Sequence, residues 1–392
     1  MRVLYLCHRH QDTQIGGLAE FLYFLPSALK AWQVEPYIYT QSVNKNDAQL
    51  SGPILLDNCV PSYSGPFLKP AFFPSKKSLQ PLLQLCHHQQ VDLIHTQGTY
   101  RAGFMAMHIH KHTRIPYVVT SHSDILTINS ERMRRRHIQG RCHRILQHAA
   151  QVTHLTTFME HASASLCNTH LKNTIIGNGI DFTIWKNYQA MPEQNYMLAI
   201  GRLEPEKGFH VIIDAYAQLT KQKSHMALVI AGTGSVESSL HAQATRLGLT
   251  VITQFNHVFP PNSVIFTGYV KKTMKMQLFA GAQMVLFAPQ PHTWEEAFGI
   301  VQLEAMAAGK VLIASDIPQT RYLQTKGLQA ALVKANDIDA WTMQMLRFIN
   351  DATLRQSWGE KNRNTAEQFD WRNIAKQYYA VYQKAIGLQQ FC

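Results

Sequence analysis

Short apolar runs alternate with longer helical patterns along this chain, and no other feature of the sequence limits its fold as strongly. Each run has about five residues, is rich in β-branched side chains, and is followed by a polar turn and an amphipathic segment. Such runs are typical of strands buried on both faces of a parallel sheet, because helices connect successive strands and cover the sheet. The alternation therefore predicts an α/β fold.

The alternation stops once, near the middle of the chain, and then starts again. The first set of predicted strands lies at 3–7, 34–40, 91–95, 116–121, 152–156 and 173–176, and the second set at 196–200, 226–231, 264–267, 284–287 and 311–314. Between the sets, Gly-Asn-Gly-Ile-Asp at 177–181 opens a polar segment that we interpret as a linker. We expect two doubly wound, Rossmann-like domains, at 1–188 and 194–369. Residues 41–74, rich in Pro, Ser and Asn, are expected to form an irregular insertion.

The composition agrees with two folded domains. A chain of 392 residues is too long for one ordinary core, and 46% hydrophobic with 16% charged residues excludes a disordered chain. No apolar window reaches the roughly 18 residues of a membrane span, and the first residues lack the apolar region of a signal peptide. The six cysteines form no Cys-x-x-Cys pair, which favours reduced thiols. We therefore expect a soluble, cytoplasmic protein.

The chain carries a net charge of +12, which predicts an affinity for anions in general. Charge alone does not choose among nucleic acid, an anionic membrane surface and phosphorylated ligands. Part of the charge lies in a predicted helix at 132–149 that contains Arg134, Arg135 and Arg136. This helix could contact anionic lipid or guide a phosphorylated acceptor, or it could simply present a solvated face.

In doubly wound sheets ligands bind beyond the carboxyl ends of the strands, so chemistry is expected in the turns that follow strands. The most informative turn follows the predicted strand at 284–287 and leads to Glu296. We expect a helix from Phe298 to Gly309, because glycine favours a helix C-terminus. Eight helical positions would separate the backbones of Glu296 and Glu304 by about 12 Å, which suits two contacts with one extended ligand.

Backbone amides at the start of this predicted helix could bind an anion between the two carboxylates. The residues concerned are Ala297, Phe298, Gly299 and Ile300. A sugar, a diphosphate and a ribose laid along the helix would use all of these groups. The alternative is an ordinary amphipathic helix, with one solvated glutamate and one glutamate that the helix dipole favours.

A second turn, at 201–208, directly follows the predicted strand at 196–200. It contains Arg202 and Lys207, two cations that could bind a diphosphate and stabilise the charge that develops when a sugar departs. Alternatively, these cations pair with the neighbouring Glu204 and Glu206 in a solvated turn.

Weaker signals lie in four other turns. They are Gly16-Gly17, His122, Gly232 in Gly-Thr-Gly, and Gly268-Tyr269-Val270. Glycine lets the backbone approach a ligand closely, a histidine at a strand end could bond a sugar or a developing charge, and Tyr269 with Val270 could lie against a base. Each of the four has an ordinary structural alternative.

No metal site is expected. Of the histidines at 108–112 only His108 and His112 share a helix face, and no glutamate lies between them as metalloproteases require. We interpret these histidines as structural or surface residues. Asp337, at the start of a helical pattern, is predicted to be an N-cap and not a metal ligand.

In this order along the chain, the turns resemble the retaining glycosyltransferases of family four. The most specific part is the pair Glu296 and Glu304, with Phe298-Gly299 between them and Glu-Ala-Met-Ala-Ala-Gly at 304–309. The turn at 201–208 and the Asn-Gly-Ile-Asp linker add to the resemblance, which extends from Gly16-Gly17 to Phe-Asp-Trp at 369–371. The resemblance implies the GT-B fold, in which two Rossmann-like domains face each other across a cleft. It also implies that a last helix, at 370–388, returns to the first domain.

The resemblance implies roles for individual residues. Glu296 would contact the donor sugar, Glu304 the ribose hydroxyls, and Arg202 with Lys207 the diphosphate. His122 matches a histidine near the sugar, so the implied catalytic set is Glu296, His122, Arg202 and Lys207. The implied donor-binding set comprises Gly16, Gly17, Arg202, Lys207, Gly232, Gly268, Tyr269, Val270, Glu296, Ala297, Phe298, Gly299, Ile300 and Glu304.

The implied activity is the transfer of a hexose-type sugar, with retention of configuration, from a nucleoside diphosphate donor to an acceptor hydroxyl. The setting would be glycan, glycolipid or cell-envelope polysaccharide synthesis. The expected partners are a nucleotide sugar, a saccharide or lipid-linked acceptor and a candidate anionic membrane surface, with no nucleic acid, metal or other cofactor.

Two alternatives stay open: a nucleotide-dependent oxidoreductase with two Rossmann domains, and a catalytically silent nucleotide-sugar-binding protein. The Gly-Thr-Gly turn argues against the oxidoreductase, because Glu237 stands where the dinucleotide-binding fingerprint has its third glycine.

Overall fold

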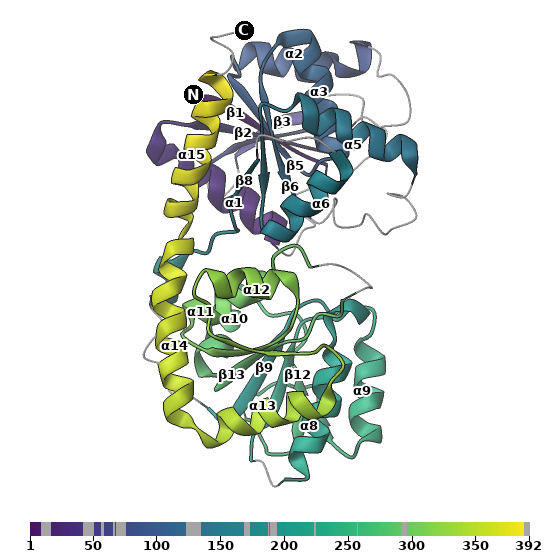
Figure 1. Cartoon of the computed structure of the whole chain (residues 1–392), viewed down its shortest axis with the longest axis vertical. Coiled ribbons are helices and arrows are strands. Elements are labelled where there is room, and N and C mark those ends of the chain that lie inside the picture. The colour runs from purple at the N-terminus through teal and green to yellow at the C-terminus, as the bar shows by residue number, and fades with distance from the viewer. Residues whose placement is uncertain are drawn as a thin grey trace. The chain divides into compact units, whose positions relative to one another are not determined.

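The computed structural model describes two compact units of the chain (Figure 1). The first unit comprises Met1–Gly179 with Trp371–Cys392, and the second comprises Ile180–Asp370. The described residues are 1–8, 17–41, 51–55, 59–65, 67, 76–122, 135–167, 173–186, 188, 194–222, 225–256, 258–291 and 296–387. Gly16 and Arg134 lie outside these ranges.

Within the described residues, the first unit has an eight-stranded sheet in the order β3-β4-β2-β1-β5-β6-β7-β8. Its strands are β1 (Arg2–Cys7), β2 (Glu35–Gln41), β3 (Ser51–Leu55), β4 (Pro61–Gly65), β5 (Leu93–Gln97), β6 (Tyr117–Ser121), β7 (Gln151–His154) and β8 (Asn173–Ile175). All pairs are parallel except β3 with β4. Because β2 lies on one side of β1 and β5 on the other, the strand order reverses at β1, as in doubly wound folds.

Helices cover both faces of this sheet. They are α1 (Gly17–Leu29), α2 (Lys76–His88), α3 (Arg101–Thr113), α5 (Arg136–His148), α6 (Thr157–Cys167) and α15 (Trp371–Gly387), with a 3₁₀ turn η2 (Lys30–Trp32). Strand β1 shows the two-sided burial that its apolar run predicts, because Leu4 and Leu6 pack with α2, α3 and α5 while Val3 and Tyr5 pack with α1 and α15.

The returning helix predicted at the C-terminus is confirmed, because α15 packs on the first unit. Its apolar side repeats every three to four residues and includes Trp371, Ile374, Tyr378 and Tyr382, all of them buried. The Tyr382 hydroxyl lies 2.7 Å from Nδ1 of His95 on β5 and 3.0 Å from the Tyr5 hydroxyl on β1. A buried polar network therefore adds directional contacts to the apolar packing.

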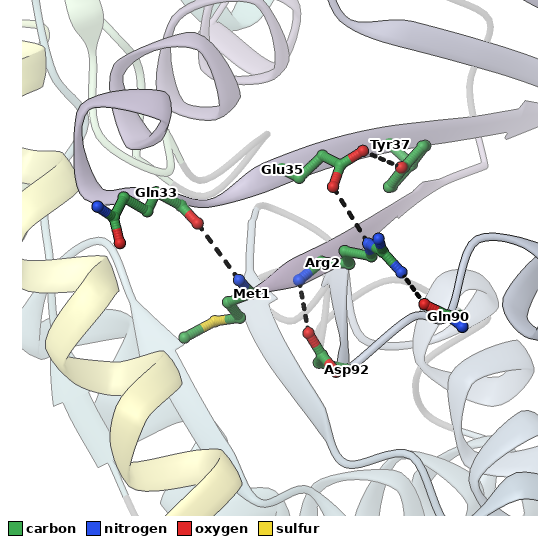
Figure 2. Close-up of polar contacts among 7 residues, drawn as sticks. All are labelled: Met1, Arg2, Gln33, Glu35, Tyr37, Gln90 and Asp92. Carbon is green, nitrogen blue, oxygen red and sulfur yellow. Dashed lines mark hydrogen bonds and ion pairs between the residues drawn. The ribbon is translucent and has the colours of Figure 1, made fainter.

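A polar cluster ties together the amino ends of β1, β2 and β5 (Figure 2). The backbone amide of Arg2 donates to Asp92 at 2.7 Å, and its side chain bonds to Glu35 at 3.1 Å and to Gln90. The Tyr37 hydroxyl and the Arg2 guanidinium lower the pKa of Glu35. Because ligands bind at the opposite, carboxyl edge of such sheets, this cluster is structural.

The expectation of an irregular insertion at 41–74 is wrong in part, since β3 and β4 lie within it. Their sequences, Ser-Gly-Pro-Ile-Leu and Pro-Ser-Tyr-Ser-Gly, contain the residues that usually mark turns. Strand β3 lies at the edge of the sheet, where proline is tolerated because one side of the strand needs no ladder hydrogen bonds. In β4, which pairs with both β3 and β2, Pro61 is the first residue, a position that also tolerates proline.

The second unit has, over its described ranges, a seven-stranded parallel sheet in the order β11-β12-β10-β9-β13-β14-β15. Its strands are β9 (Tyr196–Ile200), β10 (Ala227–Ala231), β11 (Thr250–Ile252), β12 (Ser263–Phe266), β13 (Met284–Phe287), β14 (Val311–Ser315) and β15 (Ala330–Val333). Strand β9 has β10 on one side and β13 on the other, so the strand order reverses between β9 and β13.

The helices of the second unit also lie on both faces of their sheet. They are α7 (Phe182–Lys186), α8 (Phe209–Thr220), α9 (Glu237–Arg246), α10 (Lys272–Gly281), α11 (Ile300–Ala307), α12 (Pro318–Thr325), α13 (Ile338–Asn350) and α14 (Ala352–Ala366), with 3₁₀ turns η4 (Pro205–Lys207) and η5 (Glu367–Phe369). Residues of α8, α9 and α13 share one core with the sheet, and Leu354 and Trp358 of α14 pack against it. Helices α10 and α11 contact β9, β13 and β14. The two sheets confirm the predicted α/β, doubly wound class.

The two ends of the second unit are adjacent to each other. The Ile180 amide donates to the Phe369 carbonyl at 2.8 Å, and Ile180 forms a parallel bridge with Asp370. Among the helices described, none is both long and apolar enough to cross a membrane.

Candidate functional site

The turns that follow β9 and β13 lie next to each other at the carboxyl edge of the second sheet. The strand order reverses between these two strands, and this is where doubly wound sheets bind ligands. The amide of Gln290, after β13, donates to the carbonyl of Glu206, after β9, at 2.8 Å. A backbone hydrogen bond therefore fixes one turn against the other.

Lys207 and Glu296 meet at this edge. The Lys207 ammonium donates to the Glu296 carboxylate, and each side chain is less than one-fifth exposed, at 17% and 18%. The two residues are far apart in the sequence, and their contact joins the turn after β9 to the segment that precedes α11. Partial burial reduces solvent screening, so this ion pair is stronger than a fully exposed one.

Arg202 occupies the same turn but has another partner. Its guanidinium lies 3.8 Å from the Glu206 carboxylate and is about half exposed. Glu204 accepts hydrogen bonds from the hydroxyl and the amide of Ser235, and these bonds lower the pKa of its carboxyl. The alternative considered for this turn, in which its cations pair with Glu204 and Glu206, therefore holds for Arg202, which pairs with Glu206. It does not hold for Lys207.

Glycines allow the close approach of three turns. A Cβ on Gly208 would lie 1.9 Å from the Ala288 carbonyl oxygen, and a Cβ on Gly232 would lie 1.9 Å from that of Gly201. Gly232 also donates to the Gly268 carbonyl at 2.8 Å. The Gly-Thr-Gly turn is thus packed against its neighbours, while Tyr269, beside Gly268, is about half exposed.

Helix α11 begins later than the sequence predicts. Its first residue is Ile300, because Gly299 has φ +77° and forms the N-cap in a left-handed conformation. Glu296 therefore precedes the helix, and the 12 Å separation expected from helical rise does not apply to it. The helix ends as expected, since Gly309, with φ +69°, donates to the Met306 carbonyl.

Three side chains hold α11 at its ends, and two of them, Gln302 and Asn362, are fully buried. At the start, Gln302 is fully buried and donates to the Phe298 carbonyl at 3.0 Å, which fixes the backbone before the helix. At the end, Asn362 of α14 donates to the Lys310 carbonyl at 2.9 Å, and Arg363 donates to the Ala308 carbonyl at 3.2 Å. Because both ends are held, the amides near Ile300 have fixed directions.

Glu304 lies in the second turn of α11 and pairs with Lys275 of α10. The Glu304 side chain is only 5% exposed and that of Lys275 is 23% exposed. Each glutamate of the motif is thus bonded to a lysine from another turn or helix. Lys275 could not be predicted from the sequence, because no local pattern marks a partner 29 positions away.

In the first unit, His122 directly follows β6, at the carboxyl edge of the sheet. Its Nε2 lies 2.9 Å from Oε1 of Gln97, the last residue of β5, and its ring packs edge-on against Phe21 of α1. Gln97 is buried and its Nε2 has no partner among the described groups. The amide of Gln97 therefore sets the orientation of the His122 ring, a role that the sequence analysis also missed.

Gly17 begins α1 near a second polar group of this edge. A Cβ on Gly17 would lie 3.6 Å from Nδ2 of Asn178, which is in ordinary contact. The Oδ1 atom of Asn178 is buried without a hydrogen-bond partner in the described part of the chain. Gly17, Gln97, His122 and Asn178 thus supply the polar groups of the first unit that the structure places near strand ends.

Within the described ranges, no three His, Cys, Asp or Glu side chains are grouped to hold a metal ion. Nδ1 of His110 bonds to the Ile115 carbonyl at 2.9 Å, and Asp337 accepts from the Ala340 amide at 3.0 Å. Asp337 is therefore the N-cap of α13, as the sequence predicts.

Two family models match the chain and cover it almost end to end. The model described as "Glycosyltransferase Family 4" matches residues 15–183, and the model described as "Glycosyl transferases group 1" matches residues 181–365. The boundary between the matches lies at the boundary between the two units.

Among curated proteins, the chain is similar to two bacterial mannosyltransferases. It is 27% identical over 217 residues to the phosphatidyl-myo-inositol mannosyltransferase of Mycolicibacterium smegmatis. That match covers 54% of this chain and 52% of the relative, so it spans about half the length of each. The chain is 24% identical over 378 residues to O-antigen chain mannosyltransferase C of Escherichia coli, which covers 94% of both chains.

Solved structures support the fold. Sucrose-phosphate synthase from Thermosynechococcus elongatus matches with a TM-score of 0.77 at 17% identity, covering 99% of both chains. HepE of Anabaena, solved in complex with UDP and glucose, matches with a TM-score of 0.75 at 20% identity, covering 98% of this chain and 99% of that one. With its doubly wound units, its glutamate and lysine pairs and the two matching family models, this chain belongs to the family-four, group 1 glycosyltransferases of GT-B fold.

Proposed function

We propose that this protein transfers a hexose-type sugar, with retention of configuration, from a nucleoside diphosphate donor to an acceptor hydroxyl. The observation that carries the proposal is the contact of Lys207 with Glu296, which brings an ammonium and a carboxylate together where the strand order reverses. Membership of the family supports a transferase. The mannosyltransferase relatives support a role in glycan or glycolipid synthesis.

In the proposed reaction, the acceptor hydroxyl attacks on the face of the sugar that the nucleotide leaves, and the departing phosphate accepts the hydroxyl proton. Lys207 and Arg202 stabilise the charge on the leaving diphosphate, together with the amides that precede α11. Glu296 orients the sugar through its hydroxyl groups, while Glu304 binds the ribose. For His122 we propose the role that the resemblance implies, a contact with the sugar or its developing charge.

Replacement of Glu296 and of Lys207 tests these roles separately. We expect Glu296→Gln to lower kcat by about a hundredfold while donor affinity changes only a few-fold, because the carboxylate acts on the reacting sugar. Lys207→Ala should weaken the binding of nucleoside diphosphates by about tenfold, because a charge-assisted hydrogen bond is lost. Calorimetric titration with UDP and with GDP, followed by initial-rate assays, measures both effects.

Lys221→Ala is the matched control for Lys207, because Lys221 is exposed just after α8 and away from the strand ends. It should leave affinity unchanged. Equal losses of kcat and donor affinity in Glu296→Gln would contradict the role of Glu296. An unaltered affinity in Lys207→Ala would remove that residue from the site.

We also propose that transfer needs no metal ion. Two cations and the amides that precede a helix can balance the charge of a diphosphate without one. Initial rates should then be the same with and without EDTA. A rate that falls in EDTA and returns with Mg²⁺ or Mn²⁺ would contradict this proposal.

An anionic membrane surface is the further partner that we propose, and α5 supplies the contact. Its buried side contains Ile138, Cys142, Ile145 and Leu146. Its exposed side presents Arg136, His137, Arg144 and His148, and the helix contains no acidic residue. Such a face suits a negatively charged lipid surface that carries a lipid-linked acceptor.

Vesicle binding tests this surface. Replacement of the exposed Arg135, Arg136 and Arg144 by Gln should abolish sedimentation with phosphatidylglycerol vesicles, because each basic residue near such a surface contributes about 1 kcal/mol. Neutral phosphatidylcholine vesicles are the control. Equal binding of the parent and the variant, or no binding of the parent, would contradict the proposal.

A further inference from the structure

Lys275 is the residue of the candidate site with no role assigned so far. It lies in the first turn of α10, directly after the Gly268-Tyr269-Val270 turn, and its ammonium donates to Glu304 of α11. Both partners belong to regular helices packed against the same sheet. The pair is therefore held by two rigid elements and not by flexible loops.

The burial of Glu304 makes its partner chemically important. A carboxyl group that is 5% exposed loses most of its hydration, and burial of this kind favours the neutral, protonated form. An ammonium in direct contact favours the ionised form. A carboxylate is an acceptor only, with about four lone-pair positions, so it can accept hydrogen bonds from several donors at once.

We propose that Lys275 is a positioning residue that keeps Glu304 ionised and oriented as the acceptor for the ribose hydroxyls of the donor. The inference rests on the proposed function, in which Glu304 binds the ribose. A protonated Glu304 would offer one hydroxyl donor and fewer acceptor positions, and would match two ribose hydroxyls poorly. Lys275 thus sets the preference of the site for ribonucleotides without contacting the reacting sugar.

A purely structural tie between α10 and α11 predicts a different result. Loss of such a tie would lower the stability of the protein and would weaken the binding of all nucleotides to a similar degree. A positioning role acts only through the hydroxyls that Glu304 binds. The informative quantity is therefore the ratio of dissociation constants for a deoxynucleotide and its ribonucleotide, which a structural defect leaves unchanged.

The experiment measures this ratio for UDP, GDP and their 2′-deoxy and 3′-deoxy forms by calorimetric titration of the full chain. The variants are Lys275→Met, which keeps the length of the side chain, and Lys275→Gln, which keeps its polarity and serves if the first variant does not fold. Lys272→Met is the matched control, because Lys272 begins the same helix and is exposed. Glu304→Gln provides the reference for a site without the carboxylate.

We expect the wild-type chain and Lys272→Met to prefer a ribonucleotide to at least one deoxy form by about tenfold, the value of a hydrogen bond to a charged group. Lys275→Met and Glu304→Gln should each lose most of that preference, and the double variant should lose no more than either. A wild-type preference that survives in Lys275→Met and Lys275→Gln would overturn the proposal. If the wild-type chain binds neither UDP nor GDP, the proposed function itself fails, which is a different result.

Discussion

Gly208 lies where the turn after β9 meets the loop after β13, and no other residue type fits there. Its φ of +69° is in the left-handed region, and a Cβ would lie 1.9 Å from a backbone oxygen. The contact between Lys207 and Glu296 depends on this close approach, since Lys207 is the preceding residue. A backbone requirement and a chemical requirement thus meet in two consecutive positions.

Gly208→Ala should lower the free energy of unfolding by about 2–5 kcal/mol, because the new Cβ causes steric overlap in addition to backbone strain. Gly248→Ala is the matched control, because Gly248 has φ +79° but open space around its Cβ position. It should cost about 1–2 kcal/mol, the strain alone. Urea denaturation measures both values, and equal losses in the two variants would show that the close contact with Ala288 has no energetic weight.

Residues differ in how far the sequence could predict them. Arg202, Lys207 and Glu296 stand out because each follows a strand pattern within a recognisable turn, and Glu304 stands out through its spacing from Glu296. Lys275 and Gln97 do not, because each acts through a partner on another element and carries no local signature. Only the packing of helices and strands brings Lys275 next to Glu304 and Gln97 next to His122.

At the scale of elements, α15 depends on specific polar contacts as well as on apolar packing. Its Tyr378 and Tyr382 are fully buried beneath the sheet, and burial raises the pKa of both hydroxyls, to about 12 for Tyr378. Nε2 of His95 lies 2.6 Å from the Thr120 hydroxyl, so the imidazole has a partner on each nitrogen. The network fixes the register of α15 on strands β1, β5 and β6.

Tyr382→Phe should destabilise the first unit by about 1–3 kcal/mol, because Nδ1 of His95 and the Tyr5 hydroxyl would lose a buried partner. Tyr378→Phe is the comparison, since its hydroxyl lies a longer 3.4 Å from that of Thr120. We expect that variant to cost less than 1 kcal/mol, roughly the net value of a weak hydrogen bond. Hydrogen exchange of α15 peptides reports both, and a larger effect in Tyr378→Phe would contradict the assignment.

The sequence predicts elements best where burial makes the pattern continuous. The parallel strands β1, β5, β9, β10 and β13 are examples, since their side chains are buried on both faces. Strands β3 and β4 were missed, because both are rich in proline, serine and glycine, which usually mark turns. The start of α11 was placed two residues early, because only the left-handed conformation of Gly299 shows that the helix cannot include it.

At the scale of the whole molecule, buried histidines make stability depend on pH. Burial, aided by the nearby His122, lowers the pKa of His95 to about 3, and burial lowers the pKa of His154 to about 4. Both values lie below the ordinary value of 6.5, so the unfolded chain binds protons that the folded chain does not. The resulting stability is fully present above pH 6.5 and is lost as the pH falls toward 4 and 3.

We expect the first unit to lose up to about 1.4 kcal/mol per pH unit for each of these histidines below pH 6.5. His154→Met should reduce the slope of the unfolding free energy against pH by the contribution of one proton. It removes one titrating group, while the Met side chain still fills the buried space. Hydrogen exchange measured from pH 7 to pH 4.5 follows each unit separately. An identical slope in the parent and the variant would show that His154 titrates alike in the folded and unfolded chain.

The hydrogen bond from Ile180 to Phe369 joins the point where the chain enters the second unit to the point where it leaves. A segment with neighbouring ends can be excised as a cassette, and a short peptide can close it or graft it into another host. A lineage could therefore exchange its second unit as one piece, by recombination at two breakpoints. The first unit would keep both of its own segments, because α15 is encoded beyond the second breakpoint.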